Sequence, residues 1–298
     1  MKNHAKRDLR NYNQKLINRG SLTFWFDQDC LANWVEKDRK RGRPSFVDSV
    51  IQLGLIMRSV YKLPLRVLQG FIASILKLIK VDLHSPYYCL FSKRAAETMA
   101  TLPKLSNTKP MEIAIDSSGL KMAGEGEWKV KIHGADKRRN WIKVHIGVDT
   151  RTQDLVAAIV TDEKTADSTV LPKIVESSAK TVRKVLEDGA YDSTNCRDFL
   201  CKRGVQDYIC NRRNAKVKGT QETKERDFAI EVGALVGGDK ESINLWKSIS
   251  GYHRRSFVET AFSRLKRIFG DKVKSKKFEN ISSETVFRCY VLNRMNHA

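Results

Sequence analysis

The chain has 298 residues, with 55 Lys and Arg against 34 Asp and Glu, so its formal net charge is +21. Hydrophobic residues make up 41% of the chain, which excludes global disorder. No apolar run reaches the length of a membrane span, and the six cysteines show neither a CxxC pair nor a His/Cys zinc pattern. We expect a cytoplasmic protein with reduced thiols, and the positive charge favours a polyanionic partner, nucleic acid above all.

Residues 1–108 show the pattern of a helical region with basic loops. Apolar residues recur at helical spacing over Val47–Tyr61 and Leu65–Ile79, and the short break Lys62–Pro64 separates these two predicted helices. Two helices across a short turn are compatible with a DNA-binding helix-turn-helix. An ordinary helical hairpin explains the same pattern equally well.

Arg41 and Arg43 lie in a basic loop, residues 37–44, just before the first of these helices. An Arg-Gly-Arg segment can enter the minor groove of A·T-rich DNA, where the negative potential is deep. A solvated turn before a helix accounts for the loop at least as well. Arg41 and Arg43 are therefore candidate DNA contacts, with both interpretations open.

From residue 109 onward the periodicity changes, and residues 109–298 form a second predicted region of the α/β class. The polar stretch from residue 211 to about 245 predicts loop with short helix. The order of the other elements predicts a mixed sheet between helices, because the first three strands can form a meander and later strands joined through helices run parallel. Strands are expected at Glu112–Ile115, Trp141–Val148, Leu155–Val160, Val182–Leu186 and Gln206–Cys210, and helices at Asp167–Lys180, Ser193–Lys202, Ser250–Gly270 and Ser282–Arg294.

Two acids, Asp116 and Asp188, each follow an apolar, strand-like run. In the predicted sheet the first strand is central and the fourth can pair beside it, so both acids emerge at neighbouring strand ends, where α/β sheets bind ligands. Either acid alone is as well explained by a turn or a strand end, where Asp is common. Their functional interpretation depends on a third acid.

The predicted helix 250–270 supplies that acid on a polar stripe. Tyr252, Arg255, Glu259 and Lys266 are spaced 3, 4 and 7 residues apart, which places them within an arc of about 60° on an α-helix. A separate apolar arc of the same helix would pack inward; it consists of Val258, Phe262, Leu265 and Phe269.

Three carboxylates brought together at Asp116, Asp188 and Glu259 would repel one another unless hard cations lay among them. Mg²⁺ prefers oxygen ligands and keeps places in its shell for water and phosphate oxygens. Two such ions about 4 Å apart can activate a nucleophile and stabilise a leaving 3′ oxygen. We predict that the three acids bind Mg²⁺, for which Mn²⁺ can substitute.

At these residues the chain resembles the DDE transposases of bacterial insertion sequences, and it most resembles the group named after insertion sequence five. The last segment fits the family pattern Tyr-x2-Arg-x3-Glu-x6-Lys. The matching segments are residues 113–134, 185–193 and 250–271, together with 19–27 and 63–71 in the first region.

The resemblance implies an RNase H-like catalytic domain over residues 109–298, preceded by a helical DNA-binding region over residues 1–108. It implies two Mg²⁺ ions on Asp116, Asp188 and Glu259, attack of water at the element ends, and attack of the freed 3′-hydroxyl on target DNA. The stretch between Asp188 and Glu259 is too short for the large β-rich insertion that some relatives carry.

The resemblance also places Tyr252, Arg255 and Lys266 on the phosphate backbone near the transposon end. It implies double-stranded DNA as the partner, at least a dimer on DNA because two ends must be synapsed, and association with a bacterial nucleoid. Two other function classes stay open at this point. One is a DNA-binding regulator that does not cut, and the other is a junction-resolving or RNA-degrading nuclease with the same fold.

Overall fold

The computed structural model describes residues 9–26, 29–36, 45–100, 105, 109–122, 141–178, 180–209, 216–235 and 240–297, and it divides into two compact units. The first unit consists of Met1–Pro103 and Ser275–Ala298, and the second is Lys104–Lys274. The division near residue 104 lies close to the expected change of periodicity. Residues 275–298, which we expected in the second region, group with the first unit instead.

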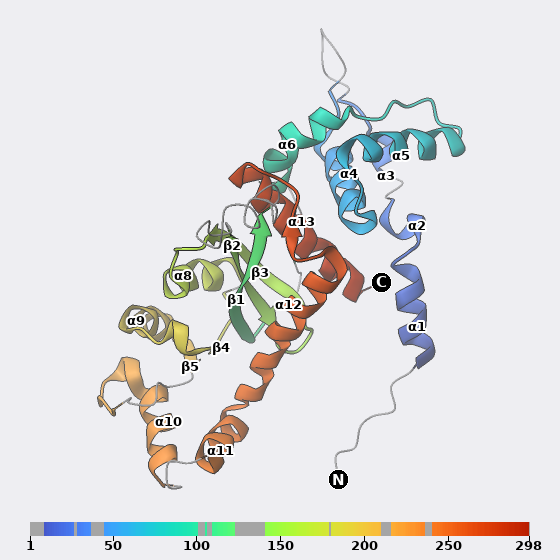
Figure 1. The fold of residues 1–298 in the computed structure, drawn as a ribbon. Helices are drawn as coiled ribbons and strands as arrows, with labels where there is room; N and C mark the ends of the chain where they lie inside the picture. Colours follow the sequence, from blue (N-terminus) through green and yellow to red (C-terminus); the bar gives the residue numbers. More distant parts are fainter. Residues whose placement is uncertain are drawn as a thin grey trace, which may run out of the picture. The chain divides into compact units, whose positions relative to one another are not determined.

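The first unit is helical in the parts that the structure describes (Figure 1). The two helices expected around residues 47–79 are present, and Lys62 turns the chain between them with a left-handed backbone, φ 57°. A role of this pair in DNA binding remains a prediction. The helices are α1 (Leu9–Asn18), α2 (Leu22–Trp25), α3 (Asp29–Ala32), α4 (Asp48–Tyr61), α5 (Leu65–Leu78), α6 (Tyr88–Ala100) and α13 (Phe278–Asn296).

Helix α13 joins the first unit because its apolar side chains pack on α4 and α6. Ile281, Phe287 and Leu292 are fully or almost fully buried. The hydroxyl of Ser283 donates a hydrogen bond to the carbonyl oxygen of Ala95 over 2.6 Å. These contacts explain why the end of the chain groups with its beginning rather than with the sheet that precedes it.

The second unit forms a mixed sheet of six strands among its described residues. The strand order is β3-β2-β1-β4-β5, and β6 pairs with β1. β1 runs antiparallel to β2 and parallel to β4, so the first strand is central with the fourth beside it, as predicted. The strands are β1 (Glu112–Met122), β2 (Trp141–Asp149), β3 (Leu155–Asp162), β4 (Lys184–Glu187), β5 (Gln206–Ile209) and β6 (Lys272–Val273).

Helices cover this sheet on both faces (Figure 1). On one face, α8 (Asp167–Ser178) and α9 (Thr194–Lys202) share an apolar core with Ile113 and Ile115 of β1. On the other face, α12 (Ser256–Phe269) contacts β1 and β2. A mixed sheet with this order and with helices on both faces is RNase H-like, which confirms the predicted fold class.

Two sequence predictions about element boundaries are wrong. Strand β1 continues through Asp116 to Met122, because its pairing with β2 extends as far as Lys121 opposite Trp141. Asp116 therefore lies within the strand and not at its end. Residues 211–245, expected to be loop with short helix, contain the 12-residue helix α10 (Lys224–Leu235) and the start of α11 (Lys240–Ser250).

The predicted single helix 250–270 is interrupted. Helix α11 ends at Ser250, and Gly251 adopts φ +67°, a left-handed conformation that few other residues accept. A short 3₁₀ helix, η3 (Tyr252–Arg255), follows and leads directly into α12. All four residues of the polar stripe follow the interruption, two of them in η3 and two in α12.

Candidate active site

Asp116 projects from the middle of β1 toward α12. Its side chain is 19% exposed, and its oxygens accept hydrogen bonds from the Ser117 N–H over 2.8 Å and from Arg255 Nη1 over 3.0 Å. Burial raises the pKa of Asp116 above its ordinary value, and the charge of Asp188 raises it further. The bonds from Ser117 and Arg255 offset part of this rise.

Asp188 comes directly after β4 and lies beside Asp116. The parallel pairing of β1 with β4 extends to Ala114 opposite Leu186, two residues before each acid. Oδ1 of Asp188 accepts a 2.8 Å hydrogen bond from the N–H of Ala190, which caps the short 3₁₀ helix η1 (Gly189–Tyr191). The sheet therefore brings the first two predicted acids together.

Glu259 lies in the first turn of α12, and Arg255 links it to Asp116. The side chain of Glu259 is 56% exposed, and its Oε1 accepts a hydrogen bond from Arg255 Nη2. The Arg255 guanidinium thus binds two of the three predicted acids at once. Burial alone would lower the pKa of Arg255, but Tyr252, Asp116 and Glu259 raise it overall.

Only oxygen ligands are offered by Asp116, Asp188 and Glu259, and that donor set fits Mg²⁺ or Mn²⁺. A divalent cation would also relieve the repulsion that raises the pKa of Asp116. Across the described part of the chain, no three or more His, Cys, Asp or Glu side chains are grouped closely enough to hold a metal ion. The Arg255 guanidinium instead pairs with both Asp116 and Glu259.

Lys266 lies two turns beyond Glu259 on α12 and faces the same strand. Its Nζ donates a 2.7 Å hydrogen bond to the hydroxyl of Ser118, two residues after Asp116 on β1. The apolar arc of α12 packs inward as predicted, since Val258, Phe262, Leu265 and Phe269 are all buried. Glu259 and Lys266 lie outside this apolar arc, and Lys266 reaches β1 through Ser118.

Tyr252, the first residue of the predicted stripe, is buried. Its side chain is 7% exposed, its hydroxyl donates a 2.7 Å hydrogen bond to the carbonyl oxygen of Glu187, and its ring packs on Trp246 with centroids 4.9 Å apart. Tyr252 and Arg255 are the first and last residues of η3, and on a 3₁₀ helix residues three apart lie on the same side. The burial of Tyr252 was not predicted, and its contact with DNA stays a prediction.

Two protein-family models, both described as "Transposase DDE domain", match the chain, one at residues 17–125 and the other at residues 107–294. The second match covers well over half of the chain and includes all three acids. The chain belongs to the DDE transposases. Neither description separates the groups of insertion sequences, so the place of this transposase in the insertion-sequence-five group stays a prediction.

Arg254 is the residue of this transposase that the sequence analysis missed. Its Nε and Nη2 each donate a 2.6 Å hydrogen bond to the carboxylate of Glu112, at the start of β1. Burial would raise the pKa of Glu112, but Arg254, Thr150 and Lys184 together lower it. The sequence His253-Arg254-Arg255 alone does not show that Arg254 holds η3 to the sheet while Arg255 reaches the acids.

The opposite face of β1 carries a second polar cluster that sequence reasoning also missed. The Ser117 hydroxyl donates a 2.9 Å hydrogen bond to Oδ2 of Asp167, and Lys143 Nζ donates a 3.0 Å bond to Oδ1. His145 lies beside this carboxylate, and burial lowers its pKa. Asp167, in the first turn of α8, thus binds β1 on the face opposite to Asp116.

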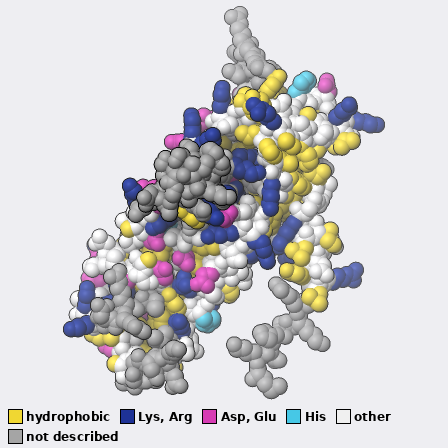
Figure 2. All heavy atoms as spheres, viewed as in Figure 1, with side chains coloured by type: hydrophobic (Ala, Val, Ile, Leu, Met, Phe, Trp, Pro, Cys, Tyr) yellow, Lys and Arg dark blue, Asp and Glu magenta, His cyan; other side chains and the backbone are white. Residues whose placement is uncertain are grey.

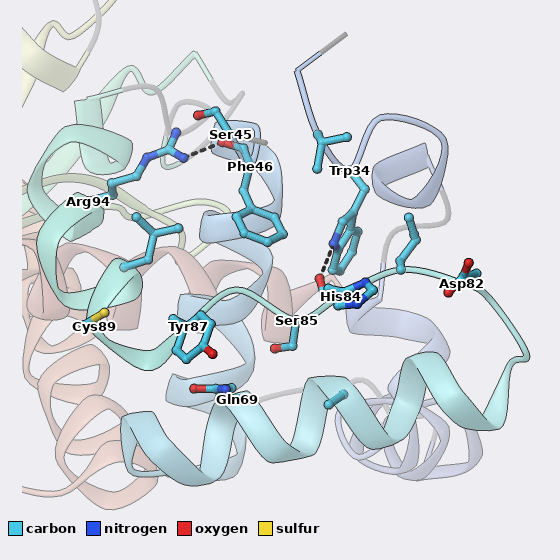
Figure 3. A pocket seen from close by; sticks show the side chains of 14 residues that line it. Trp34, Ser45, Phe46, Gln69, Asp82, His84, Ser85, Tyr87, Cys89 and Arg94 are labelled. Atoms are coloured by element: carbon cyan, nitrogen blue, oxygen red, sulfur yellow. Dashed lines mark hydrogen bonds between the residues drawn. The ribbon is translucent and has the colours of Figure 1, made fainter. Parts of the chain in front are cut away.

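A pocket of about 1010 Å³ lies within the first unit (Figure 3). Trp34, Phe46 and Tyr87 contribute aromatic rings to its lining, and Arg94 and Asp82 are its only charged Arg, Lys, Asp or Glu residues. Asp82 is the single carboxylate in the lining of this pocket. Arg41 and Arg43, the predicted minor-groove contacts, lie outside the described residues.

The surface of the second unit is not uniformly basic. On the face shown in Figure 2, acidic side chains gather over the part of the sheet where β1 and β4 lie in Figure 1, with Lys and Arg side chains among them. The described helices include none that is both long and apolar enough to cross a membrane.

Proposed function

We propose that this transposase cuts DNA at the ends of an insertion sequence and joins the freed 3′-hydroxyl to target DNA. The observation that best supports the proposal is the convergence of Asp116, Asp188 and the Arg255–Glu259 pair on one side of the RNase H-like sheet. Double-stranded DNA is the proposed partner. Because two element ends must be held together, we propose that the transposase works on DNA at least as a dimer.

The proposed cofactor is Mg²⁺, with Mn²⁺ as a substitute, held by Asp116, Asp188 and Glu259. When bound at such a site, divalent ions lower the pKa of water and stabilise the leaving oxygen of a phosphodiester. For these carboxylates to take up cations, Arg255 must release at least one of its two partners.

The cations of this site are suited to phosphate groups. Arg255 carries a planar guanidinium that can form two parallel hydrogen bonds to a phosphate, whereas Lys266 provides a point charge. Both lie next to acids of the proposed site, Arg255 through its bonds to Asp116 and Glu259 and Lys266 through Ser118. We assign them to the backbone of the DNA that is being cut.

The direct test is cleavage of a duplex that carries one terminal repeat of the element, with Mg²⁺ or Mn²⁺, by Asp116→Asn, Asp188→Asn and Glu259→Gln. Each change keeps the size of the side chain and removes its charge, so cleavage should fall by about 10³-fold or more while DNA binding is retained. Asp198→Asn is the matched control, because Asp198 is an exposed acid paired only with Lys202 among its described ion pairs.

Metal-dependent cleavage that survived all three changes would overturn the proposal. DNA binding without any cleavage by the wild-type chain would instead favour the regulator considered above. Cleavage of branched DNA or RNA in preference to the terminal repeat would favour a nuclease of the same fold.

A further inference from the structure

Helix α5 packs on the rest of the first unit with one face only. Leu68, Ile72 and Leu76, each four residues from the next, are buried. The residues on the opposite side are exposed and lie within an arc of about 140°. We call this side the outer face of α5; it consists of Arg66, Val67, Gly70, Ala73, Ser74, Lys77 and Leu78.

The charged residues of the outer face are both cations. Arg66 and Lys77 lie near its two ends, about 16 Å apart along the helix axis, and α5 contains no Asp or Glu. The Arg66 guanidinium lies over the ring of Tyr88, with its Cζ 4.8 Å from the ring centroid. The sequence of the whole first unit has 22 Lys and Arg against 10 Asp and Glu. The charge of this face therefore suits a polyanion.

Gly70, at the centre of the outer face, is not explained by the packing of the protein. A β-carbon at this position would meet no described neighbouring atom within 4 Å. Gly54 of α4 differs, because a β-carbon there would overlap the ring of Phe91. A glycine inside a helix is less stable than an alanine, so an exposed helical glycine without a packing reason suggests the close approach of another molecule.

Duplex DNA fits the outer face in size as well as in charge. The major groove is about 12 Å wide and admits one α-helix. Cations at the two ends of such a helix can bind phosphates on both strands that border the groove, and a central glycine lets the helix backbone approach the bases. Val67 and Leu78 are 52% and 80% exposed, and apolar groups of this kind contact the methyl group of thymine.

The exposed side of α6 is less suited to DNA. Lys93 and Glu97 are both exposed and lie four residues apart, so they share one face of the helix. The carboxylate offsets the charge of the ammonium group and would repel a phosphate. Of these two neighbouring helices, α5 is the one with an outer face free of acids.

We propose that the outer face of α5 docks in the major groove of the terminal repeat of the element, with the backbone at Gly70 close to the bases. In this arrangement α4 and α5 form a DNA-binding helix-turn-helix and not an ordinary helical hairpin. The inference rests on the proposed function, which supplies duplex DNA as the partner, and it names the surface that binds this DNA.

The main test compares Gly70→Gln with Gly233→Gln in the full-length chain. Gly233 lies inside α10 and, like Gly70, has no described neighbouring atom within 4 Å of a β-carbon. Because glutamine favours a helix more than glycine does, both changes should keep or raise the Tm. Only Gly70→Gln should weaken binding to a labelled duplex that carries one terminal repeat, by about 10-fold or more, measured by fluorescence anisotropy in EDTA.

Gly70→Ala adds only a methyl group, so its loss of affinity should be smaller than that of Gly70→Gln. Unchanged affinity in Gly70→Gln would overturn the proposal. A lower Tm in Gly70→Gln would also overturn it, because it would show that Gly70 serves the packing of the protein. Changed self-association without DNA, at unchanged DNA affinity, would show that the outer face binds a second copy of the chain instead.

The salt dependence of binding tests the cations of the outer face. Lys77→Ala should reduce the slope of log affinity against log salt by about 1, because one phosphate contact is lost. Lys93→Ala, on the exposed side of α6, is the matched control and should leave the slope unchanged. A smaller slope in Lys93→Ala but not in Lys77→Ala would place DNA on α6 and overturn the proposal.

A failure of the proposed function would look different. If the wild-type chain binds the terminal repeat no better than a scrambled duplex of equal length, recognition of the element end is wrong, and both proposals fall together. If the wild type prefers the terminal repeat and Asp116→Asn abolishes cleavage, but Gly70→Gln keeps the wild-type preference, only the docking of α5 is wrong.

Discussion

Helices η3 and α12 follow one another without a break, but they use their polar side chains differently. In η3, both Tyr252 and Arg254 donate hydrogen bonds to the sheet. Tyr252 bonds to the backbone carbonyl of Glu187, and Arg254 bonds to the carboxylate of Glu112. In α12, Glu259 remains more than half exposed, and Lys266 reaches only the hydroxyl of Ser118 among its described partners. Polar residues in one continuous helical stretch can thus include some that hold the site together and others that stay exposed to solvent.

Arg255 lies at the boundary between these two segments. It is the last residue of η3, and its guanidinium bonds to Asp116 on β1 and to Glu259 on α12. Substitutions on the two sides of this boundary should therefore affect different quantities. Substitutions in η3 should change the stability of the fold and the geometry of the acids. Substitutions in α12 should change DNA binding and cleavage.

Among the basic residues of these two segments, the largest effect is expected from Arg255→Ala. Cleavage should fall by about 100-fold or more, the loss typical when one group that stabilises transition-state charge is removed. Without DNA, Mg²⁺ should raise the Tm of the variant more than that of the wild type, because Asp116 and Glu259 no longer pair with a guanidinium. Thermal unfolding in EDTA and in Mg²⁺ measures this difference.

Arg255→Lys provides the matched control for charge. It keeps a cation but cannot bond to two carboxylates in the fork geometry, so it should recover the Tm in EDTA more fully than the cleavage rate. Equal Mg²⁺-induced shifts in the wild type and Arg255→Ala would show that Arg255 does not compete with the metal.

An intermediate effect is expected from Arg254→Ala. Loss of the paired hydrogen bonds to Glu112 should lower the free energy of unfolding by about 1–2 kcal/mol, at the lower end for a charged pair because the Arg254 side chain is 38% exposed. Urea denaturation measures the change. His253→Ala, at the exposed neighbouring position, should change stability by less than about 0.5 kcal/mol.

The same pair predicts a pH dependence. The pKa of Glu112 is lowered in the folded protein, so its pairing stabilises the fold above the unfolded pKa of about 4.3 and is lost as the pH falls through the lower, folded value. The difference in stability between the wild type and Arg254→Ala should shrink over that acidic range. A difference that stays constant throughout that acidic range would contradict the role of Glu112.

The smallest effect is expected from Lys266→Ala. Removing one phosphate contact should weaken DNA binding a few-fold and reduce the slope of log affinity against log salt by about 1, with stability nearly unchanged. Arg267→Ala, at the exposed next position of α12, is the matched control and should leave the slope closer to that of the wild type. An unchanged slope in Lys266→Ala, together with a lower free energy of unfolding, would show that Lys266 stabilises the fold, as Arg254 does, and does not contact DNA.

The sequence was sufficient to predict the sheet and the relation between its two acids. Strands joined through helices must run parallel, so the fourth strand could be placed beside the first and Asp188 beside Asp116. The apolar arc of α12 was equally predictable, because Val258, Phe262 and Leu265 recur at helical spacing and are buried. In both cases a strong periodic pattern determines the structure.

Where a single residue changes the local conformation, the sequence was not sufficient. Gly251 lies in a stretch whose spacing suits one long helix, but its positive φ separates α11 from η3, and Tyr252 at the start of η3 is buried. Likewise, Arg254 and Arg255 are chemically identical, and only the three-dimensional position of Glu112 and Asp116 distinguishes them. Such differences arise from tertiary contacts, which local spacing does not encode.

The membership of α13 in the first unit has a consequence for biosynthesis. Helices α4 and α6 leave the ribosome early, but α13, which packs on both, follows only after the whole sheet has been made. At about 5–20 residues per second, the interval between the end of α6 and the start of α13 is roughly 10–40 s. During that interval the nascent first unit exposes the apolar surface that α13 later covers, so the unit that begins the chain is the last to be completed.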